Sequence, residues 1–219
     1  MKKCNPLLIV IFSLFLAACV LIESPPVDAV SVQLKWVHQA QFAGIYIAQD
    51  KGYYAEENLD VTILEGGPGI NSIQSLFQGN ADFTIDSAIN CLLSRDQGEP
   101  VVAIAAIYRH NPTVFGTMPD SGIEHPADFI GKKVAIAGGS DFEIQLQAIA
   151  NKLGLDMDQI DIVPHSYDIT PLYSGEIDVL GIYAIGGLIR AQQAGYDLDV
   201  IWPSDYGVHS YADVLISTD

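Results

Sequence analysis

Basic residues are scarce in this 219-residue sequence. Ten Lys and Arg residues stand against 27 Asp and Glu residues, which gives a formal net charge of −17. Binding to nucleic acid requires clustered Lys and Arg side chains that displace counterions from the phosphates, so we exclude nucleic acid as a partner. The 49% of hydrophobic residues excludes an intrinsically disordered chain. The length is sufficient for one domain or two small ones.

Motifs of several enzyme and cofactor sites are missing. The five His residues lack the i, i+3 or i, i+4 spacing of a helical zinc site, so we predict no metal. No Gly-x-Ser-x-Gly elbow supports a hydrolase. The glycine clusters at 66–69 and 138–139 lack both the Lys-Ser/Thr pair of a phosphate loop and the spacing of a dinucleotide fingerprint. We therefore predict no cofactor.

Cysteine is also rare, and the first two of three cysteines lie in an N-terminal targeting segment. Lys2 and Lys3 precede an apolar run at 7–16, which is shorter than the roughly 20 residues of a membrane span, so residues 1–18 are predicted to be a secretory signal peptide. Leu16-Ala17-Ala18-Cys19 resembles the lipobox of bacterial lipoproteins and predicts lipidation of Cys19, with ordinary signal cleavage as the alternative. Residues 19–29 would then be a lipid-anchored tether to the extracytoplasmic face of the membrane. Cys91 is left without a disulfide partner and is predicted to be a buried structural thiol.

Strand-like and helix-like segments alternate along the rest of the chain in two series. The first series has expected strands at 30–36, 61–64, 83–85 and 101–108, with helices at 44–57, 70–78 and 87–96. The second has expected strands at 133–137, 161–164, 179–182 and 200–202, with helices at 141–153, 171–174 and 186–194. This alternation predicts an α/β fold with two lobes, residues 30–115 and 116–205. Residues 111–131 include Met118-Pro119 and His125-Pro126 and show little helical periodicity, so they are the predicted hinge.

Aromatic residues occur where expected strands end. Trp36 and Tyr183 are placed in this way, and open α/β sheets bind ligands outside the carboxyl ends of their strands. An aromatic cleft with few cations suits a flat, neutral or weakly charged heterocycle. The two glycine clusters follow strands and precede helices, where they either approach a ligand or form plain tight turns. Ser140 or Asp141 in the second cluster is equally suited to capping the next helix.

The segment from Gln33 to Tyr46 and the following Lys51-Gly52-Tyr53-Tyr54 resemble a known family. They are similar to the solute-binding proteins related to thiamine-pyrimidine synthase and to the sulfonate-binding lipoproteins of ABC importers. The resemblance implies a two-lobed, type II periplasmic binding protein fold that closes on a small molecule and presents it to an ABC permease. In that family the chain returns to the first lobe with further helices. Residues 206–219 are therefore the expected start of this crossover, and we expect either a C-terminal truncation or an incompletely covered first lobe.

The same resemblance implies a set of ligand-binding residues. They come from the first matching segment, the loops after the strands and the far wall of the cleft: Trp36, His38, Gln39, Gln41, Tyr46, Gly67, Asp86, Ser87, Gly139, Ser140, Asp141, Tyr183 and Asp205. Trp36 and Tyr183 are suited to stacking on a ring. Asp86, Asp205 and Gln39 are suited to binding its polar edge.

Departures from the family pattern leave alternatives for the solute and the function. Trp36-Val37-His38-Gln39 differs from the Trp-Thr-Pro-Asn type of pyrimidine-precursor members, and it resembles riboflavin-binding importer lipoproteins and sensor modules of signalling kinases. The synthase branch uses a Cys-rich motif that this chain lacks, so we expect no enzyme activity. We expect a membrane-anchored binding protein for a thiamine pyrimidine precursor, riboflavin or a similar molecule. A synthase-like enzyme and a ligand-sensing module are the alternatives.

Overall fold

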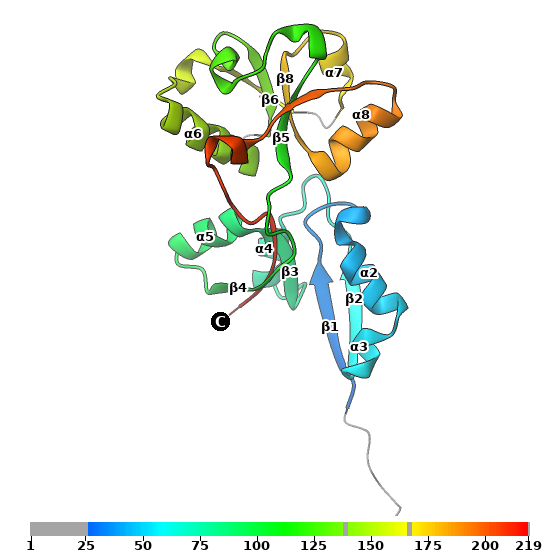
Figure 1. The fold of residues 1–219 in the computed structure, drawn as a ribbon. Coiled ribbons are helices and arrows are strands. Elements are labelled where there is room, and N and C mark those ends of the chain that lie inside the picture. Colours follow the sequence, from blue (N-terminus) through cyan, green and yellow to red (C-terminus); the bar gives the residue numbers. More distant parts are fainter. Residues whose placement is uncertain (1–25, 138–139, 166–167, 219) are drawn as a thin grey trace, which may run out of the picture.

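The computed structural model describes residues 26–137, 140–165 and 168–218, which form two α/β lobes joined by a narrow connection (Figure 1). Each lobe is built on a five-stranded sheet with helices packed against it. The predicted signal peptide, Cys19 and Gly139 lie outside the described residues. Within the described ranges, no helix combines the length and the apolar character that a membrane crossing requires.

The first lobe contains a mixed sheet in the order β2-β1-β3-β10-β4. Its strands are β1 (Asp28–Gln33), β2 (Leu59–Leu64), β3 (Phe83–Ser87), β4 (Val101–Ala106) and β10 (Asp213–Thr218). Its helices are η1 (Ala40–Phe42), α2 (Ala43–Asp50), α3 (Tyr53–Glu56), α4 (Ser72–Phe77) and α5 (Ala88–Asp96). The expected helix 44–57 is divided because Gly52, with a φ of 77°, takes the left-handed conformation between α2 and α3.

The second lobe repeats this plan in the order β7-β6-β8-β5-β9. Its strands are β5 (Thr113–Thr117), β6 (Lys133–Ile136), β7 (Asp161–Pro164), β8 (Val179–Tyr183) and β9 (Asp199–Ile201). Its longer helix is α6 (Asp141–Leu153), followed by the shorter α7 (Thr170–Tyr173), the π-helical η5 (Ala184–Leu188) and α8 (Ile189–Gln193). The short 3-10 helices are η2 (Pro119–Ser121), η3 (Pro126–Phe129), η4 (Met157–Gln159) and η6 (Pro203–Tyr206).

The prediction of a hinge at 111–131 is wrong for residues 113–131, because they lie within the second lobe and include β5, an inner strand of its sheet. All five residues of β5 are buried, and β5 pairs with both β8 and β9. Pro119 and Pro126 open η2 and η3, at the first helical position where the missing N–H costs nothing. The expected lobe boundary after residue 115 thus falls inside β5.

The chain crosses between the lobes twice, at 107–112 and at 207–212, and the two crossings are hydrogen-bonded to each other (Figure 1). The Ala212 N–H donates to the Tyr108 carbonyl at 3.1 Å, and the Asn111 side chain donates to the Ser210 hydroxyl at 2.9 Å. A paired connection of this kind allows bending between the lobes while limiting sliding and twist. We therefore assign the hinge to these two segments.

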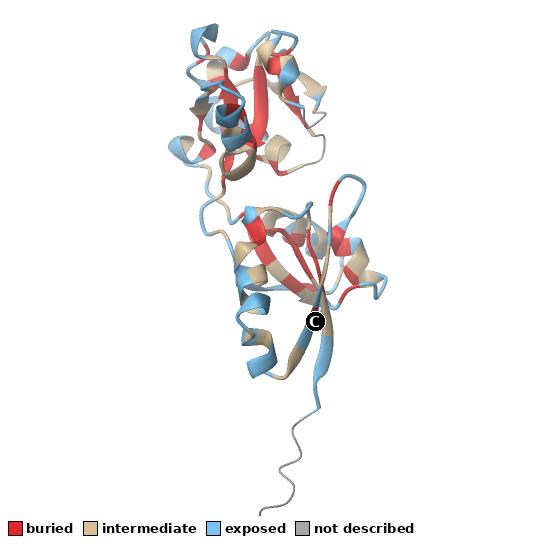
Figure 2. Cartoon of the chain, turned by 90° about the vertical axis from the view of Figure 1, so that its right-hand side faces the viewer, coloured by how far each residue is buried: buried red, intermediate tan, exposed pale blue. Residues whose placement is uncertain are grey.

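Each lobe has its own hydrophobic core, centred on its sheet (Figure 2). Leu34, Phe42 and Ile85 are buried in the first lobe. Phe115 and Phe129 pack edge to face in the second, with ring centroids 5.6 Å apart. Cys91 is a buried free thiol in the first-lobe core, as predicted. Two separate cores allow the lobes to move as rigid units around whatever binds between them.

Candidate ligand-binding cleft

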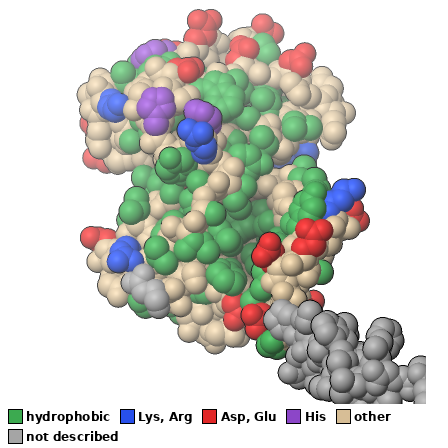
Figure 3. Space-filling view, turned by 60° about the horizontal axis from the view of Figure 1, so that its bottom comes forward, with side chains coloured by type: hydrophobic (Ala, Val, Ile, Leu, Met, Phe, Trp, Pro, Cys, Tyr) green, Lys and Arg blue, Asp and Glu red, His purple; other side chains and the backbone are tan. Residues whose placement is uncertain are grey.

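A cleft of about 570 Å³ lies between the two lobes, and the carboxyl ends of strands from both sheets form its walls. Lys35 and Trp36 follow β1, Asp86 is the penultimate residue of β3, and Tyr183 ends β8. Figure 3 shows hydrophobic side chains gathered across the middle of one face, where the lobes meet, with acidic side chains toward the outer ends of both lobes. The position is the one at which open α/β sheets bind small molecules.

Lys35 connects the two lobes across this cleft. Its Nζ lies 2.6 Å from Oδ1 of Asp213, a fully buried carboxylate on β10 of the first lobe. The same Nζ donates a hydrogen bond of 2.9 Å to the Tyr183 hydroxyl of the second lobe and lies 5.0 Å from the centroid of that ring. One ammonium group therefore neutralises a buried carboxylate and holds the opposite wall in place.

The surroundings of Lys35 keep it charged. Burial opposes the charge, but the Tyr183 hydroxyl and the nearby carboxylates, Asp213 first among them, outweigh this and hold the pKa of Lys35 above its usual range. Burial also raises the pKa of Tyr183 to about 12, although Lys35 acts in the opposite direction. At neutral pH the pair is an ammonium group and a neutral phenol.

Two glutamine side chains extend this polar network along the first lobe. Gln39 donates from Nε2 to Oε1 of Gln41, and Gln41 in turn donates from Nε2 to Oδ2 of Asp213. Asp213 therefore has Lys35 on one oxygen and Gln41 on the other. Gln41 is occupied on both sides, whereas the side-chain oxygen of Gln39 accepts no bond within the described residues and remains available in the cleft.

Asp86 lines the cleft, but its oxygens are occupied by groups of its own lobe. Oδ2 accepts from the Ser72 hydroxyl. Oδ1 accepts from the Ser87 backbone N–H at 2.6 Å and from the Asn90 side chain at 2.8 Å. The Ser87 hydroxyl, also on the cleft, caps α5 by accepting from the Asn90 backbone N–H at 3.0 Å. The Asp86 carboxylate is therefore held in place by hydrogen bonds from its own lobe, and both of its oxygens already have donors.

Asp141 differs from Asp86 in its hydrogen bonding. It is only 7% exposed and lines the cleft from the first turn of α6, yet neither oxygen accepts a hydrogen bond of ordinary geometry from the described residues. Burial raises the pKa of Asp141, while Lys35 and the Ser87 hydroxyl favour the ionised form. Ser140 precedes it as the N-cap residue, but its hydroxyl donates to the Ala137 carbonyl instead. A buried acceptor without a partner is costly unless a ligand supplies a donor.

Aromatic rings flank this carboxylate. Trp36 forms part of the first-lobe wall, and Phe142 lies against Tyr183 with ring centroids 5.6 Å apart and planes tilted by 54°. Gly181 permits this arrangement, because a Cβ there would lie 2.7 Å from Ile136 Cγ2 and 3.0 Å from the Phe142 ring. Phe142 can therefore pack directly over β8 and present its outer edge to the cleft.

Four of the sequence-predicted ligand residues lie away from the cleft lining. His38 is exposed, and its Nδ1 is 2.8 Å from the hydroxyl of Tyr46, which packs on the first-lobe core. Gly67 is buried with a φ of 140°, and a Cβ at this position would lie 3.2 Å from Cγ1 of Val37. Asp205 is exposed in η6, after the outermost strand β9. Those that line the cleft are Trp36, Gln39, Gln41, Asp86, Ser87, Ser140, Asp141 and Tyr183.

The sequence reasoning missed Lys35, Asp213, Phe142, His165 and Arg190, all but Asp213 being part of the cleft lining. Lys35 and Phe142 adjoin predicted site residues, and their positions next to Trp36 and Asp141 were a usable signal. No local sequence signal pointed to Asp213, because its role depends on the pairing of β10 with β3, in which Asp213 stands opposite Ser87.

Residues 39–219 match the family model described as NMT1/THI5 like. The chain belongs to the NMT1/THI5-like family. The predicted resemblance is therefore confirmed at the level of family and two-lobed fold. The chain is similar to binding proteins and to a synthase.

The chain is 28% identical over 225 residues to the formylaminopyrimidine-binding protein of Halalkalibacterium halodurans, across all of this chain and 68% of that protein. It is 27% identical over 150 residues to the 4-amino-5-hydroxymethyl-2-methylpyrimidine phosphate synthase of Legionella pneumophila, across 68% of this chain and 47% of that protein. The fold is similar to that of the periplasmic aliphatic sulphonate-binding protein SsuA of Escherichia coli, with a TM-score of 0.73 and 17% identity over 87% of this chain and 65% of that one. The chain thus spans between about half and two thirds of the lengths of these proteins.

Proposed function

We propose that this chain is the extracytoplasmic solute-binding component of an ABC importer and that it captures a small nitrogen heterocycle by closure of its two lobes. The observation that carries this proposal is the buried carboxylate of Asp141, which accepts no hydrogen bond of ordinary geometry from the described residues and lies in a cleft also lined by Trp36, Phe142 and Tyr183. An amino group or a ring N–H on a flat ligand would supply the missing donor while the ring stacks on the aromatic walls. The N-terminal signal pattern supports the extracytoplasmic location, and lipidation at Cys19 is part of the proposal.

An aminopyrimidine of the thiamine-precursor type fits these features best. Such a ring is planar and carries an exocyclic amino group, which is a donor for a carboxylate. The similarity to the formylaminopyrimidine-binding protein over the whole of this chain supports the same choice. Riboflavin, also a planar heterocycle with an N–H donor, is the competing solute.

A binding protein is favoured over a synthase by the side chains that face the cleft. Lys35, a lysine of the cleft lining, is held in an ion pair with Asp213 and is protonated, so it is a poor nucleophile. Cys91, the one cysteine among the described residues, is buried in the core of the first lobe. His38 is exposed and hydrogen-bonded to Tyr46, outside the cleft lining.

Calorimetry and thermal unfolding with four compounds test the proposal. The compounds are 4-amino-5-hydroxymethyl-2-methylpyrimidine, its formylamino analogue, riboflavin and an alkanesulfonate. A ligand at 100 times its dissociation constant stabilises a protein by about 2.7 kcal/mol, which is a visible shift in unfolding temperature. We expect stabilisation by an aminopyrimidine. Failure of all four compounds to bind would overturn the proposal.

Variants and a turnover assay sharpen the same test. Asp141→Asn should weaken aminopyrimidine binding, whereas Asp205→Asn, the same change at an exposed position outside the cleft, should not. Incubation of the chain with pyridoxal phosphate should release no pyrimidine phosphate. Formation of that product would show an enzyme and replace the importer proposal with the synthase alternative.

A further inference from the structure

Four strands lie at sheet edges, where the backbone pairs with a neighbouring strand on one side only. In the described part of the chain these are β2 and β4 of the first sheet and β7 and β9 of the second. An edge presents unpaired N–H and C=O groups to any further strand, and proteins usually protect it with charged side chains or proline. The four edges can therefore be compared by the side chains that each strand carries.

Three of these edges carry the usual protection. β2 contains Asp60, β7 contains Asp161 and ends with Pro164, and β9 begins with Asp199. If two copies of the chain paired at one of these edges, an acidic strand would lie against an identical acidic strand, and like charges on paired strands are destabilising. These three edges are therefore poor sites for self-association.

β4 lacks this protection. Its sequence, Val-Val-Ala-Ile-Ala-Ala, contains neither a charged residue nor proline. Val101 belongs to the core of the first lobe, whereas the five residues after it are all exposed, Ile104 by 52%. In Figure 1 the strand lies on the side of the first lobe away from α2 and α3. An uncharged and exposed edge of this kind is an available site for another strand.

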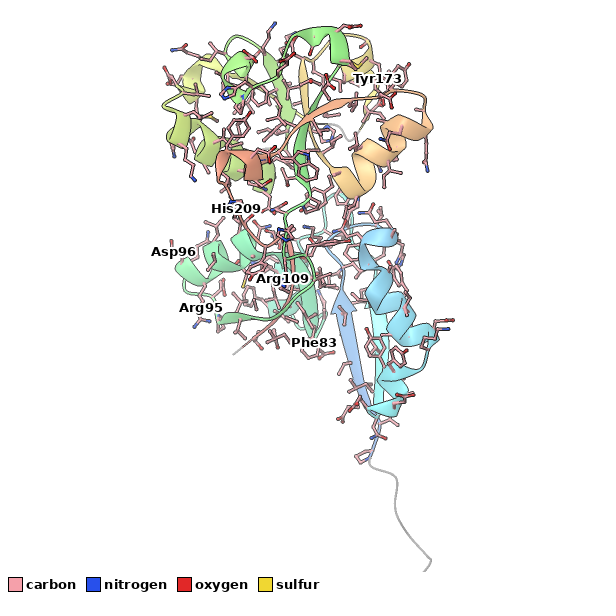
Figure 4. The ribbon with its side chains drawn as sticks, in the orientation of Figure 1. Phe83, Arg95, Asp96, Arg109, Tyr173 and His209 are labelled. Atoms are coloured by element: carbon pink, nitrogen blue, oxygen red, sulfur yellow. The ribbon has the colours of Figure 1, made fainter. Side chains whose placement is uncertain are left out.

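The charges that flank β4 favour a second copy of this chain in antiparallel orientation. Glu99 precedes the strand, and Arg109 follows it in the connection to β5 (Figure 4). Neither residue has a salt-bridge partner among residues 26–137, 140–165 and 168–218. A twofold axis near the middle of β4 would bring the start of each strand against the end of the other. Glu99 of each copy would then approach Arg109 of the second copy.

One irregularity of β4 limits the strength of such pairing. The register of β4 against β10 shifts between Leu215 and Ile216, so Ile104 has no residue of β10 opposite it. A bulge twists an edge strand and shortens the regular stretch that a further strand can use. Contact through one short strand is also expected to bury less than the roughly 1,200–2,000 Å² of a stable interface. We therefore expect a reversible dimer with a dissociation constant in the micromolar range.

We propose that β4 is a self-association edge, at which two copies of this chain pair in antiparallel orientation and join their first-lobe sheets into one continuous sheet. β4 contributes no residue to the lining of the interlobe cleft, so this pairing uses none of the candidate ligand-binding residues. The inference goes beyond the proposed function, because the partner is a second copy of the chain and the solute has no part in it.

Analytical ultracentrifugation of the purified chain tests the self-association. Between about 1 and 200 μM, a range that brackets the expected constant, the protein should change from monomer to dimer. Ile104→Lys should abolish the dimer, because it places like charges close to the twofold axis. Ile130→Lys is the matched control, since Ile130 is also exposed, by 42%, and lies in the second lobe. This variant should dimerise as the parent protein does.

A charge exchange tests the antiparallel orientation. Glu99→Arg and Arg109→Glu should each weaken the dimer about tenfold, because each turns two attractive contacts into two repulsive ones. The double variant should restore the affinity of the parent protein. Hydrogen exchange supplies a second measurement. The amides of β4 should become protected as the protein concentration rises, whereas those of β2, the other edge of the same sheet, should not.

Three results would overturn the inference. The first is a protein that remains monomeric over the whole concentration range. The second is a dimer that persists in Ile104→Lys or that forms without added protection of the β4 amides. The third is a double variant that dimerises no better than the two single variants. Ligand binding by the monomer is unaffected in each case, so the proposed function stands or falls by its own tests.

Discussion

Lys35 and Tyr183 belong to different lobes, and the lysine donates a hydrogen bond of 2.9 Å directly to the tyrosine hydroxyl. The same lysine is anchored to the first lobe by Asp213. The lobes therefore have an attraction of their own across the cleft. Under the proposed function, a solute that contacts both walls would add to this attraction. Lobe closure would then be a shift between two populations that the Lys35 bridge biases toward the closed one.

Removal of the tyrosine hydroxyl should open the molecule. Tyr183→Phe keeps the ring and its contact with Phe142 but deletes the acceptor for Lys35, and a hydrogen bond to a charged group contributes about 1.5–3 kcal/mol. Small-angle scattering of the ligand-free protein should show a larger radius of gyration.

Tyr173→Phe is the control for this change, because Tyr173 lies in α7 at the far end of the second lobe (Figure 4). An unchanged radius in Tyr183→Phe would mean that the bridge does not bias closure.

The ion pair between Lys35 and Asp213 should be important for stability. Lys35→Met leaves the fully buried Asp213 carboxylate without its cation, and breaking a buried pair in this way costs about 3–5 kcal/mol. The free energy of unfolding from urea titration measures the loss. Lys51→Met, the same change at an exposed lysine after α2, should stay within about 0.5 kcal/mol of the parent protein. Comparable losses in both variants would contradict the assigned role.

Two buried aspartates should respond in opposite ways to the same substitution. The raised pKa of Asp141 means that the folded state favours the protonated acid, so stability falls as the pH rises through that pKa and a cost remains at pH 7. Asp141→Asn should therefore not reduce stability at pH 7. Asp213→Asn should reduce it by about 1–3 kcal/mol, because it removes the partner of Lys35. Equal effects would show that Asp141 is already satisfied in the free protein.

Tyr183 should ionise later than an ordinary tyrosine. Its pKa is raised from 10.0 to about 12, so its contribution to stability is fully present below pH 10 and is lost as the pH rises through about 12. Ultraviolet titration of the folded parent protein should contain one late phenolate transition that is missing from Tyr183→Phe. Identical titration curves below pH 12, with no late transition in the parent protein, would contradict the buried, neutral phenol.

Intrinsic fluorescence should locate the ligand at Trp36. The sequence has two tryptophans, of which Trp36 lines the cleft and Trp202 packs against the second-lobe core. Ligand-induced quenching should persist in Trp202→Phe and disappear in Trp36→Phe. Trp36→Ala should also weaken binding, whereas Trp202→Ala should affect mainly the unfolding free energy. Quenching that depends on Trp202 would remove Trp36 from the site.

Local sequence patterns predicted most elements of both lobes because hydrophobic periodicity reports burial within a few residues. Helix 141–153 and strand 161–164 were predicted with the bounds they have. β5 was missed because its five residues include Gly116 and stand between prolines 112 and 119, which weaken the local strand signal. Its strand conformation depends instead on its two partners in the sheet.

The residues of the candidate site were likewise predictable where a local sequence pattern locates them, and not where their position depends on distant strand pairing. Trp36, Asp141 and Tyr183 were accessible because they stand at strand ends and helix starts, which local patterns locate. The ion pair of Lys35 depends on β10, and a pairing with a strand so distant in the sequence has no local signature. Asp205 has the right chemistry and lies outside the cleft lining, because residue type carries no information on which edge of the sheet a side chain occupies.

The insertion of β10 between β3 and β4 also sets an order of assembly. The first sheet is interrupted by the whole second lobe, and its fourth position stays empty until the last residues of β10 have been synthesised. The second lobe, by contrast, is one continuous stretch of chain and can complete its sheet earlier. During synthesis or export we therefore expect the second lobe to fold first and the N-terminal lobe to finish last, with strand insertion as the slow, long-range step.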